Sequence, residues 1–208
     1  VISAPNTIFK DIYQLLPGHS ITLYSPRIEY LPKSEPWWEL KSTIEESLKD
    51  PIFKVDEAIL NIEDSLKKAI KLQSFADVPL GTFLSGGVDS SLITALLQAQ
   101  SSSKIKTFTI GFEDKQFNEA PFSKEIANYL ETDHREFYLT SKDAQEIIPK
   151  LNRIYSEPFA DSSQIPTHLV CREASNIGLK VALSGDGGDE LFGGYNRYLI
   201  AKDIWGKI

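Results

Sequence analysis

The sequence predicts an α/β protein whose parallel β-sheet is covered by helices on both faces. Short apolar runs bounded by turn residues alternate with longer runs of helical spacing, which is the pattern of repeated β–α units. Hydrophobic residues make up 41% of the 208 and charged residues 25%, as in soluble globular proteins. No apolar run approaches the roughly 18 residues that cross a membrane.

The first 30 residues are expected to be β-rich. A turn at Pro17-Gly18 precedes the strand-like run Ser20–Tyr24. Residues 31–55 then have the Pro, Ser, Lys and Glu composition of a linker, interrupted by Trp37 and Trp38. We place a domain boundary here and expect both tryptophans to be buried against a neighbouring domain.

Residues 56–208 are predicted to form the α/β domain. An amphipathic helix opens the domain at Asp56–Leu72, and a last helix is expected at Arg197–Trp205. Between them, strands are predicted at Pro79–Leu84, Ile105–Phe112, His134–Leu139 and Leu179–Ser184. The alternating helices are predicted at Ser90–Ala99, Pro121–Leu130, Ser141–Ile154 and Thr167–Ile177.

The run Phe83–Ser91 reads as the end of a strand, a tight turn and the start of a helix. Its backbone N–H groups and the dipole of the following helix would bind a phosphate or pyrophosphate. Gly86 and Gly87 let the ligand approach the backbone closely. Asp89 would repel phosphate unless Mg²⁺ lies between them, so the run predicts a metal-assisted phosphate site. The run lacks both the lysine of a Walker loop and the spacing of a dinucleotide turn.

A second glycine-rich run, Ser184–Tyr195, follows the last predicted strand. Ligands of parallel sheets bind beyond the carboxyl ends of the strands, so this run is expected to share an edge with the first loop and with the segment after Ile110. Asp186, Asp189 and Glu190 concentrate negative charge there. That concentration is favourable only with a cation such as Mg²⁺.

Together these motifs resemble a known family. Ser85–Ser91 resembles the pyrophosphate loop of the ATP pyrophosphatases, and with Ser184–Tyr195 it resembles the synthetase domain of glutamine-hydrolysing asparagine synthetase. Residues 7–19 are similar to the end of that family's glutaminase domain. The resemblance therefore implies three parts: the edge of a glutaminase domain at 1–30, a linker at 31–55 and the first part of an ATP-dependent synthetase domain, of the adenine nucleotide alpha hydrolase-like fold, at 56–208.

The resemblance also implies roles for individual residues. The adenosine pocket would be lined by Leu84, Ile110, Ser184 and Gly185. The pyrophosphate would be held by Ser85, Gly86, Gly87, Asp89, Ser90 and Ser91. Mg²⁺ would be held by Asp89 and Asp189, Asp186 would be the catalytic carboxylate, and the amino-acid substrate would contact Glu157, Asp161 and Ser162.

The implied function is the ATP-dependent amidation of aspartate to asparagine. The reaction would pass through β-aspartyl-AMP, use ammonia from glutamine and release AMP and pyrophosphate. Two alternatives stay open: a related adenylate-forming amidotransferase for another carboxylate (a sugar acid, peptide or β-amino acid), and a non-catalytic nucleotide-binding module. The stretch from Glu157 to Gln164 has no arginine where better-known bacterial enzymes have a Thr/Arg-containing run, so the acceptor carboxylate stays open too.

The expected partners are ATP, aspartate and ammonia or glutamine, with a homodimer possible. The net charge of −7 argues against nucleic-acid binding, and nothing in the sequence indicates a membrane. The single cysteine, Cys171, is expected in the core and fits a reducing cytoplasm. Because the sequence has no methionine, we expect an internal piece of a longer protein. Family members use a lysine that would lie beyond Ile208, so we expect these residues alone to be inactive.

Overall fold

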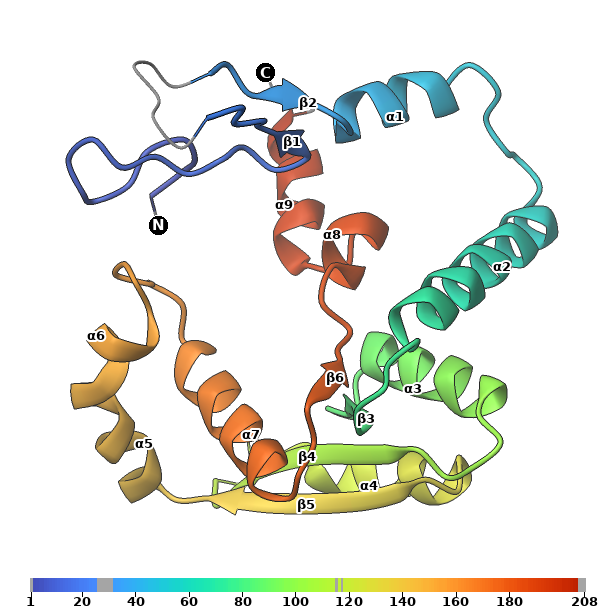
Figure 1. Ribbon diagram of the computed structural model, residues 1–208. Coiled ribbons are helices and arrows are strands. Elements are labelled where there is room, and N and C mark those ends of the chain that lie inside the picture. The colour runs from blue at the N-terminus through green and yellow to red at the C-terminus, as the bar shows by residue number, and fades with distance from the viewer. Residues whose placement is uncertain (1, 26–31, 115, 117, 206–208) are drawn as a thin grey trace. The chain divides into compact units, whose positions relative to one another are not determined.

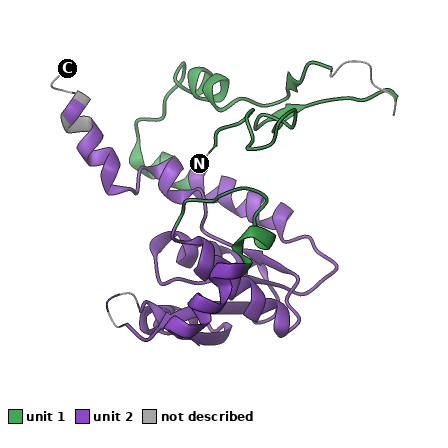
Figure 2. Cartoon of the chain, turned by 90° about the vertical axis from the view of Figure 1, so that its left-hand side faces the viewer, with its two compact units in different colours: residues 1–60, 150–161 green, residues 61–149, 162–208 purple. Residues whose placement is uncertain are grey.

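A computed structural model describes residues 2–25, 32–114, 116 and 118–205. The chain divides into two compact units (Figure 2). The first consists of Val1–Leu60 and Lys150–Asp161, and the second of Asn61–Pro149 and Ser162–Ile208. We describe each unit by itself.

A four-stranded parallel sheet forms the centre of the second unit (Figure 1). Its strands are β3 (Leu80–Phe83), β4 (Lys106–Phe112), β5 (Asp133–Leu139) and β6 (Val181–Leu183). Their order is β5-β4-β3-β6, so the chain builds outward from β3 in one direction and then returns to its other side. The predicted parallel sheet and all four strands are confirmed, with ends that differ by one or two residues.

Helices pack on both faces of this sheet, as the α/β pattern predicts. They are α2 (Val55–Gln73), α3 (Val88–Gln100), α4 (Ala120–Tyr129) and α7 (Gln164–Asn176).

Two apolar clusters show which residues cover each face. One cluster joins Leu96 and Leu97 of α3 to Ile70 of α2, with Leu80 and Leu183 of the sheet packed against them. The other joins Ala174 of α7 to Phe108, with Phe83, Phe137 and Ala182 alongside. Ala182 and Leu183 are consecutive residues of β6 yet belong to different clusters, because successive side chains of a strand point to opposite faces.

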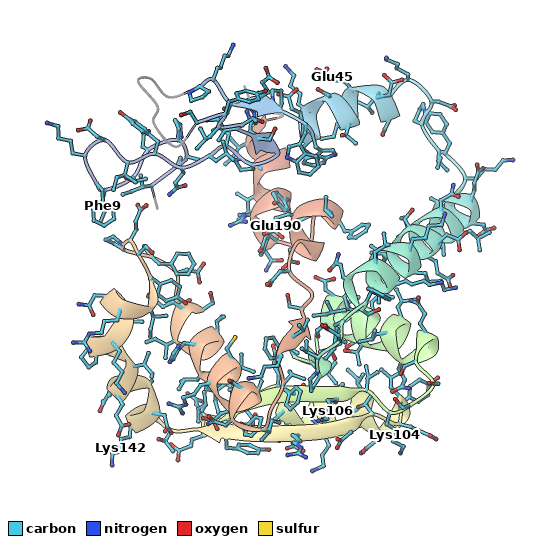
Figure 3. All side chains as sticks on the ribbon, in the orientation of Figure 1. Phe9, Glu45, Lys104, Lys106, Lys142 and Glu190 are labelled. Carbon is cyan, nitrogen blue, oxygen red and sulfur yellow. The ribbon has the colours of Figure 1, made fainter. Side chains whose placement is uncertain are left out.

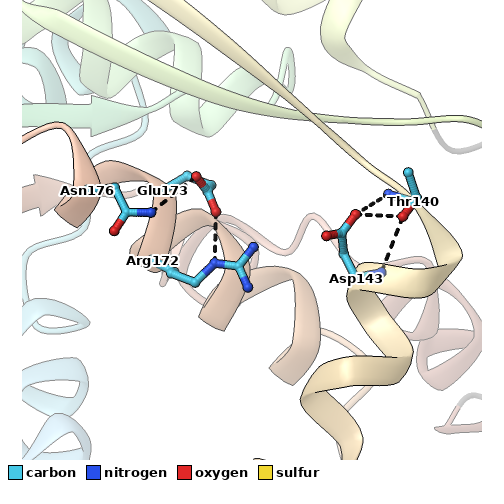
Figure 4. Close-up of polar contacts among 5 residues, drawn as sticks. All are labelled: Thr140, Asp143, Arg172, Glu173 and Asn176. Atoms are coloured by element: carbon cyan, nitrogen blue, oxygen red, sulfur yellow. Dashed lines mark hydrogen bonds and ion pairs between the residues drawn. The ribbon is translucent and has the colours of Figure 1, made fainter.

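The predicted helix Ser141–Ile154 is broken into three pieces. They are α5 (Ser141–Ile147), the 3₁₀ turn η1 (Ile148–Lys150) and α6 (Leu151–Ile154). Pro149 explains the break, because proline has no N–H to donate and its ring clashes with the preceding turn. At the start of α5, Thr140 and Asp143 form a reciprocal capping box (Figure 4).

Extended structure in the first unit is shorter than predicted. β1 covers only His19–Ser20 and pairs antiparallel with β2 (Glu35–Pro36), so the expected strand Ser20–Tyr24 is wrong beyond its first residue. Tyr30 and Leu31, the expected boundary, lie outside the described residues. The predicted linker contains a helix, α1 (Leu40–Ser47).

The expected burial of the two tryptophans is not found. The backbone N–H groups of Trp37 and Trp38 both donate to the Gly18 carbonyl, but the residues are 73% and 46% exposed.

Two helices close the second unit after β6. They are α8 (Gly188–Phe192) and α9 (Asn196–Trp205), and the second matches the predicted last helix. Within the described ranges, none of the helices is both long and apolar enough to cross a bilayer.

Candidate functional site

The first loop joins β3 to α3, and two of its N–H groups have partners: that of Ser85 donates to the Ser90 hydroxyl and that of Gly87 to the Ser85 hydroxyl. α3 begins at Val88 with Gly87 as its N-cap, and no side chain caps the amides of its first turn. Gly86 has φ +82°, a left-handed conformation that favours glycine and turns the chain between strand and helix. The amides of a first helical turn have no partner within the helix. Such a helix start would favour an anion, as the sequence predicts.

Hydrogen bonds of three serine hydroxyls fix the conformation of this loop. The buried Ser90 hydroxyl lies 2.9 Å from the Ser85 hydroxyl and accepts a bond from the Ser85 N–H at 3.1 Å. The Ser91 hydroxyl donates to the Gly87 carbonyl at 2.6 Å, and the Ser90 hydroxyl also points there at 3.3 Å. Because Ser91 already satisfies this carbonyl, Ser90 can give its hydrogen to Ser85 instead. The exposed Ser85 hydroxyl is then free to donate to a phosphate oxygen.

The second loop follows β6 and runs into the short helix α8. The Ser184 hydroxyl donates to Asp186 at 2.9 Å, which holds the exposed Asp186 carboxylate close to the end of the strand. Gly187 and Gly193 cap the two ends of α8 in left-handed conformations. This loop thus carries its three acids on a short, capped helical turn and the segment just before it.

The two loops meet at Asp89. A Cβ built on Gly185 would lie 2.8 Å from the Ser90 nitrogen and 2.9 Å from Cβ of Asp89. One built on Gly188 would overlap the Asp89 carboxylate. Both distances are shorter than real Cβ contacts, so only glycine permits this approach. The expectation that the second loop lies beside the first is confirmed between Asp89 and Gly185–Gly188, whereas a metal ion shared by Asp89 and Asp189 stays a prediction.

The sheet order explains the meeting. β3 and β6 are neighbours, yet β3 leads into α3 and β6 is reached through α7, and these helices pack on opposite faces. The gap between β3 and β6 is therefore the point at which the strand order reverses. Ligands of open parallel sheets bind outside the carboxyl ends of the strands at such a point.

The acids around the loops offer oxygen donors of the kind that Mg²⁺ prefers. The Asp89 carboxylate faces the second loop, whereas the Asp189 carboxylate packs against Gly194 within its own loop. Glu190 on α8 (labelled in Figure 3) accepts a hydrogen bond from the Tyr195 hydroxyl at 2.8 Å. That bond holds the pKa of Glu190 below its ordinary value, so this side chain is tied to Tyr195.

Among the described residues, no three His, Cys, Asp or Glu side chains form a metal-binding group. The loop carboxylates would suit a Mg²⁺ that is shared with phosphate oxygens, because one or two protein carboxylates suffice for such a site.

The residues predicted for adenosine lie at the same edge of the sheet. Leu84 is buried directly after β3, Ile110 is near the end of β4, and Ser184 and Gly185 follow β6. The Leu84 N–H donates to the Phe108 carbonyl at 2.8 Å, so this amide is not available to a ligand. The Leu84 carbonyl accepts a hydrogen bond from the Thr109 hydroxyl, so only its second lone pair is left for a ligand.

The residues predicted for the amino-acid substrate are divided between the units. Glu157 and Asp161 belong to the first unit, where Glu157 accepts a hydrogen bond from the Gln14 side chain at 3.2 Å. Ser162 belongs to the second unit. A substrate site made of these three residues stays a prediction.

Other side chains differ from expectation. Cys171 on α7 is exposed, so its predicted core position is wrong: Leu169 and Ala174 form the buried side of that helix. On the surface of α7, Arg172 pairs with Glu173, which also accepts a bond from Asn176 (Figure 4).

Sequence reasoning missed three buried threonines beneath the first loop: Thr82, Thr94 and Thr109. A threonine at an otherwise apolar core position was the signal that could have found them.

Comparison with known proteins shows which family the chain resembles. A family model described as "Asparagine synthase" matches residues 61–207. A putative glutamine-hydrolysing asparagine synthetase 2 from Methanocaldococcus jannaschii is 36% identical over 199 residues, which cover 95% of this chain and 37% of that protein. A glutamine-hydrolysing asparagine synthetase 1 from Bacillus subtilis is 30% identical over 197 residues, covering 95% of this chain and 29% of that protein. The chain thus spans about a third of the length of these relatives.

Solved structures give a more distant likeness. An ammonia-dependent NAD synthetase from Campylobacter jejuni superposes with a TM-score of 0.41 and 13% identity, over 59% of this chain and 54% of that one.

Proposed function

Because the chain belongs to the asparagine synthase family, we propose that it forms the ATP site of an enzyme that converts aspartate to asparagine. In this proposal ATP activates the side-chain carboxylate of aspartate as β-aspartyl-AMP, and ammonia derived from glutamine displaces AMP. The observation that carries the proposal is the close approach of the second loop to Asp89, whose Cβ and backbone lie against Gly185 and whose carboxylate lies against Gly188. This approach supports a single site in which both loops would contact the leaving pyrophosphate.

The first loop would bind the pyrophosphate. The Gly86 and Ser90 N–H groups at the helix start would supply donors, and the Ser85 hydroxyl would add another. The Gly87 N–H is bonded to the Ser85 hydroxyl and the Ser91 hydroxyl to the Gly87 carbonyl, so Gly87 and Ser91 would shape the loop around the phosphate. Asp89 and Asp189 would hold Mg²⁺, which neutralises negative charge on the phosphates when bound. Leu84, Ile110, Ser184 and Gly185 would line the adenosine pocket at the adjoining strand ends.

The reaction would balance in two steps. A carboxylate oxygen of aspartate attacks the α-phosphorus as the bond to the β-phosphate oxygen breaks, and pyrophosphate leaves. Ammonia then attacks the acyl carbon, the bond from that carbon to the AMP oxygen breaks, and a proton is lost from the attacking nitrogen. Asp186, which is exposed and accepts a hydrogen bond from the Ser184 hydroxyl, would accept that proton. Positioning and charge neutralisation supply the rest.

Pyrophosphate release by the full-length protein that carries this sequence tests the proposal. With Mg·ATP and ammonium present, release should depend on aspartate, and asparagine should form in equal amount. The Asp89→Asn variant should abolish both while the melting temperature stays close to wild type. The matched control is Asp133→Asn, an exposed acid at the start of β5 and so at the opposite edge of the sheet, which should leave both activities intact.

The acceptor carboxylate is decided in the same assay. Sugar acids, β-amino acids and a peptide with a free carboxylate replace aspartate in parallel reactions. Release with one of these and not with aspartate would move the proposal to a related amidotransferase. Binding of ATP with no release under any condition would favour a nucleotide-binding module.

A further inference from the structure

Buried threonine hydroxyls lie under both ends of the first loop. Thr82 and Thr94 are fully buried and Thr109 is 3% exposed, although each occupies a position in the core where valine would fit by shape. Burying a hydroxyl among apolar side chains is unfavourable unless the hydroxyl is hydrogen-bonded. Each of the three is bonded, and their bonds lead to the loop.

At the helical end of the loop, the chain of bonds runs from strand to helix. The Thr94 hydroxyl donates to the Ser90 carbonyl at 2.7 Å and lies 2.9 Å from the Thr82 hydroxyl. Thr94 has one hydroxyl hydrogen, and it goes to Ser90, so Thr82 must be the donor to Thr94. This fixes the direction of the relay: Thr82 on β3 holds Thr94 on α3, and Thr94 holds the backbone of Ser90.

At the other end of the loop, where β3 ends, a third threonine also binds the backbone. The Thr109 hydroxyl on β4 donates to the Leu84 carbonyl, the last backbone group before the loop. The Leu84 N–H is bonded to the Phe108 carbonyl on the same strand, so both backbone groups of Leu84 are fixed to β4. The residues between the two anchors, 85–89, are the ones that would contact phosphate.

We propose that Thr82, Thr94 and Thr109 are positioning residues that set the shape of the phosphate loop for ATP. The inference rests on the proposed function, since it assigns the loop to the pyrophosphate of ATP. None of the three would touch the nucleotide. They would act through Ser90 and Leu84, and a displacement at either anchor would move the loop amides away from the phosphate oxygens.

The chain offers a matched control in Thr107. It is fully buried on the same sheet and pairs in register with Thr82, but its hydroxyl contacts Thr132 and His134 instead of the loop. Thr→Val at this position removes a buried hydroxyl at similar cost to stability without touching either anchor. It thus separates general weakening of the core from loss of loop shape.

The experiment compares Thr94→Val, Thr109→Val, Thr107→Val and the conservative Thr94→Ser in the full-length protein. Calorimetric titration with Mg·ATP gives the dissociation constant, and urea unfolding gives stability. We expect Thr94→Val and Thr109→Val to weaken Mg·ATP binding by about fivefold each, the worth of one hydrogen bond. Thr94→Ser should restore binding, and Thr107→Val should bind as wild type despite a similar loss of stability. If Thr94→Val does not fold, Thr109→Val and Thr82→Val carry the test.

The other outcomes overturn the inference in distinguishable ways. Equal weakening in all valine variants, Thr107→Val included, would show a core effect only. Wild-type affinity in Thr94→Val and Thr109→Val would remove the positioning role and leave the proposed function standing. Failure of the wild-type protein to bind Mg·ATP would remove the proposed function and this inference with it.

Discussion

Replacing Gly188 with alanine tests whether the two loops act as one site. The added Cβ would overlap the Asp89 carboxylate, which must then rotate away or push α8 back. The atoms that the new Cβ would overlap are the terminal atoms of the Asp89 side chain, so a rotation of this side chain is easier than a shift of α8. We expect Gly188→Ala to fold normally and to lose affinity for Mg·ATP.

The expected magnitudes follow from the geometry. Alanine in place of glycine, where the backbone conformation suits both, adds about 0.4–1 kcal/mol of stability because the unfolded chain has less freedom to lose. Turning Asp89 off its preferred rotamer costs about 0.5–1.5 kcal/mol. These effects nearly cancel, so the melting temperature should move by no more than about 4 °C. The displaced carboxylate would lose interactions worth roughly 1.5–3 kcal/mol, which is about ten- to a hundredfold in the dissociation constant.

Calorimetric titration with Mg·ATP, paired with thermal unfolding, measures both quantities. The Leu191→Ala variant serves as the control, because Leu191 lies on the same helix and is 70% exposed. In an Asp89→Ala background the added methyl has nothing to displace, so Gly188→Ala should have no further effect on affinity. Wild-type affinity in Gly188→Ala, or an equal loss in both backgrounds, would refute the contact between the loops as the basis of binding.

Three further predictions concern titratable groups. Burial lowers the pKa of His134 below its ordinary value, so the folded state binds fewer protons than the unfolded state. The stability that neutral His134 contributes should be complete above about pH 6.5 and should be lost as the pH falls. In urea unfolding, the free energy of unfolding of His134→Asn should therefore fall less between pH 7 and pH 5 than that of the wild type. Tyr195→Phe should raise the pKa of Glu190 toward its ordinary value in an NMR titration, because the hydroxyl that holds it down is removed. Cys171 should react fully with a thiol reagent in the folded protein, at a rate that climbs with pH because partial burial raises its thiol pKa; protection until unfolding would contradict its exposure.

The sheet could be predicted from the sequence because its strands are short apolar runs between glycine, proline and polar turns. The run from Pro79 to Leu84 ends at the glycines of the first loop, and the run from Leu179 to Ser184 ends at those of the second. Such local signals fix where a strand stops to within a residue or two. The helix expected at Ser141–Ile154 failed because its periodicity was read across Pro149.

Other features lay beyond local patterns. Cys171 was expected inside because cysteine is usually buried, but the face that a helical residue presents depends on what packs beside it. The strand expected at Ser20–Tyr24 has suitable residues, yet only His19–Ser20 finds a partner, and a strand without one leaves its backbone groups unpaired. The threonine anchors depend on which side chains meet across α3, β3 and β4, and a single sequence does not record that.

The placement of the site follows from the strand order more than from any motif. β6 is the last strand in the chain, but it pairs with β3, the first strand of the sheet. Two parallel neighbours must release their loops at the same edge, and the helix that follows β3 and the helix that precedes β6, α3 and α7, pack on opposite faces. The Asp89 carboxylate is consequently held between its own helix start and the backbone of Gly185–Gly188. In the proposed phosphate site a carboxylate at this place would be unfavourable without a cation, and this supports the Mg²⁺ of the proposed reaction.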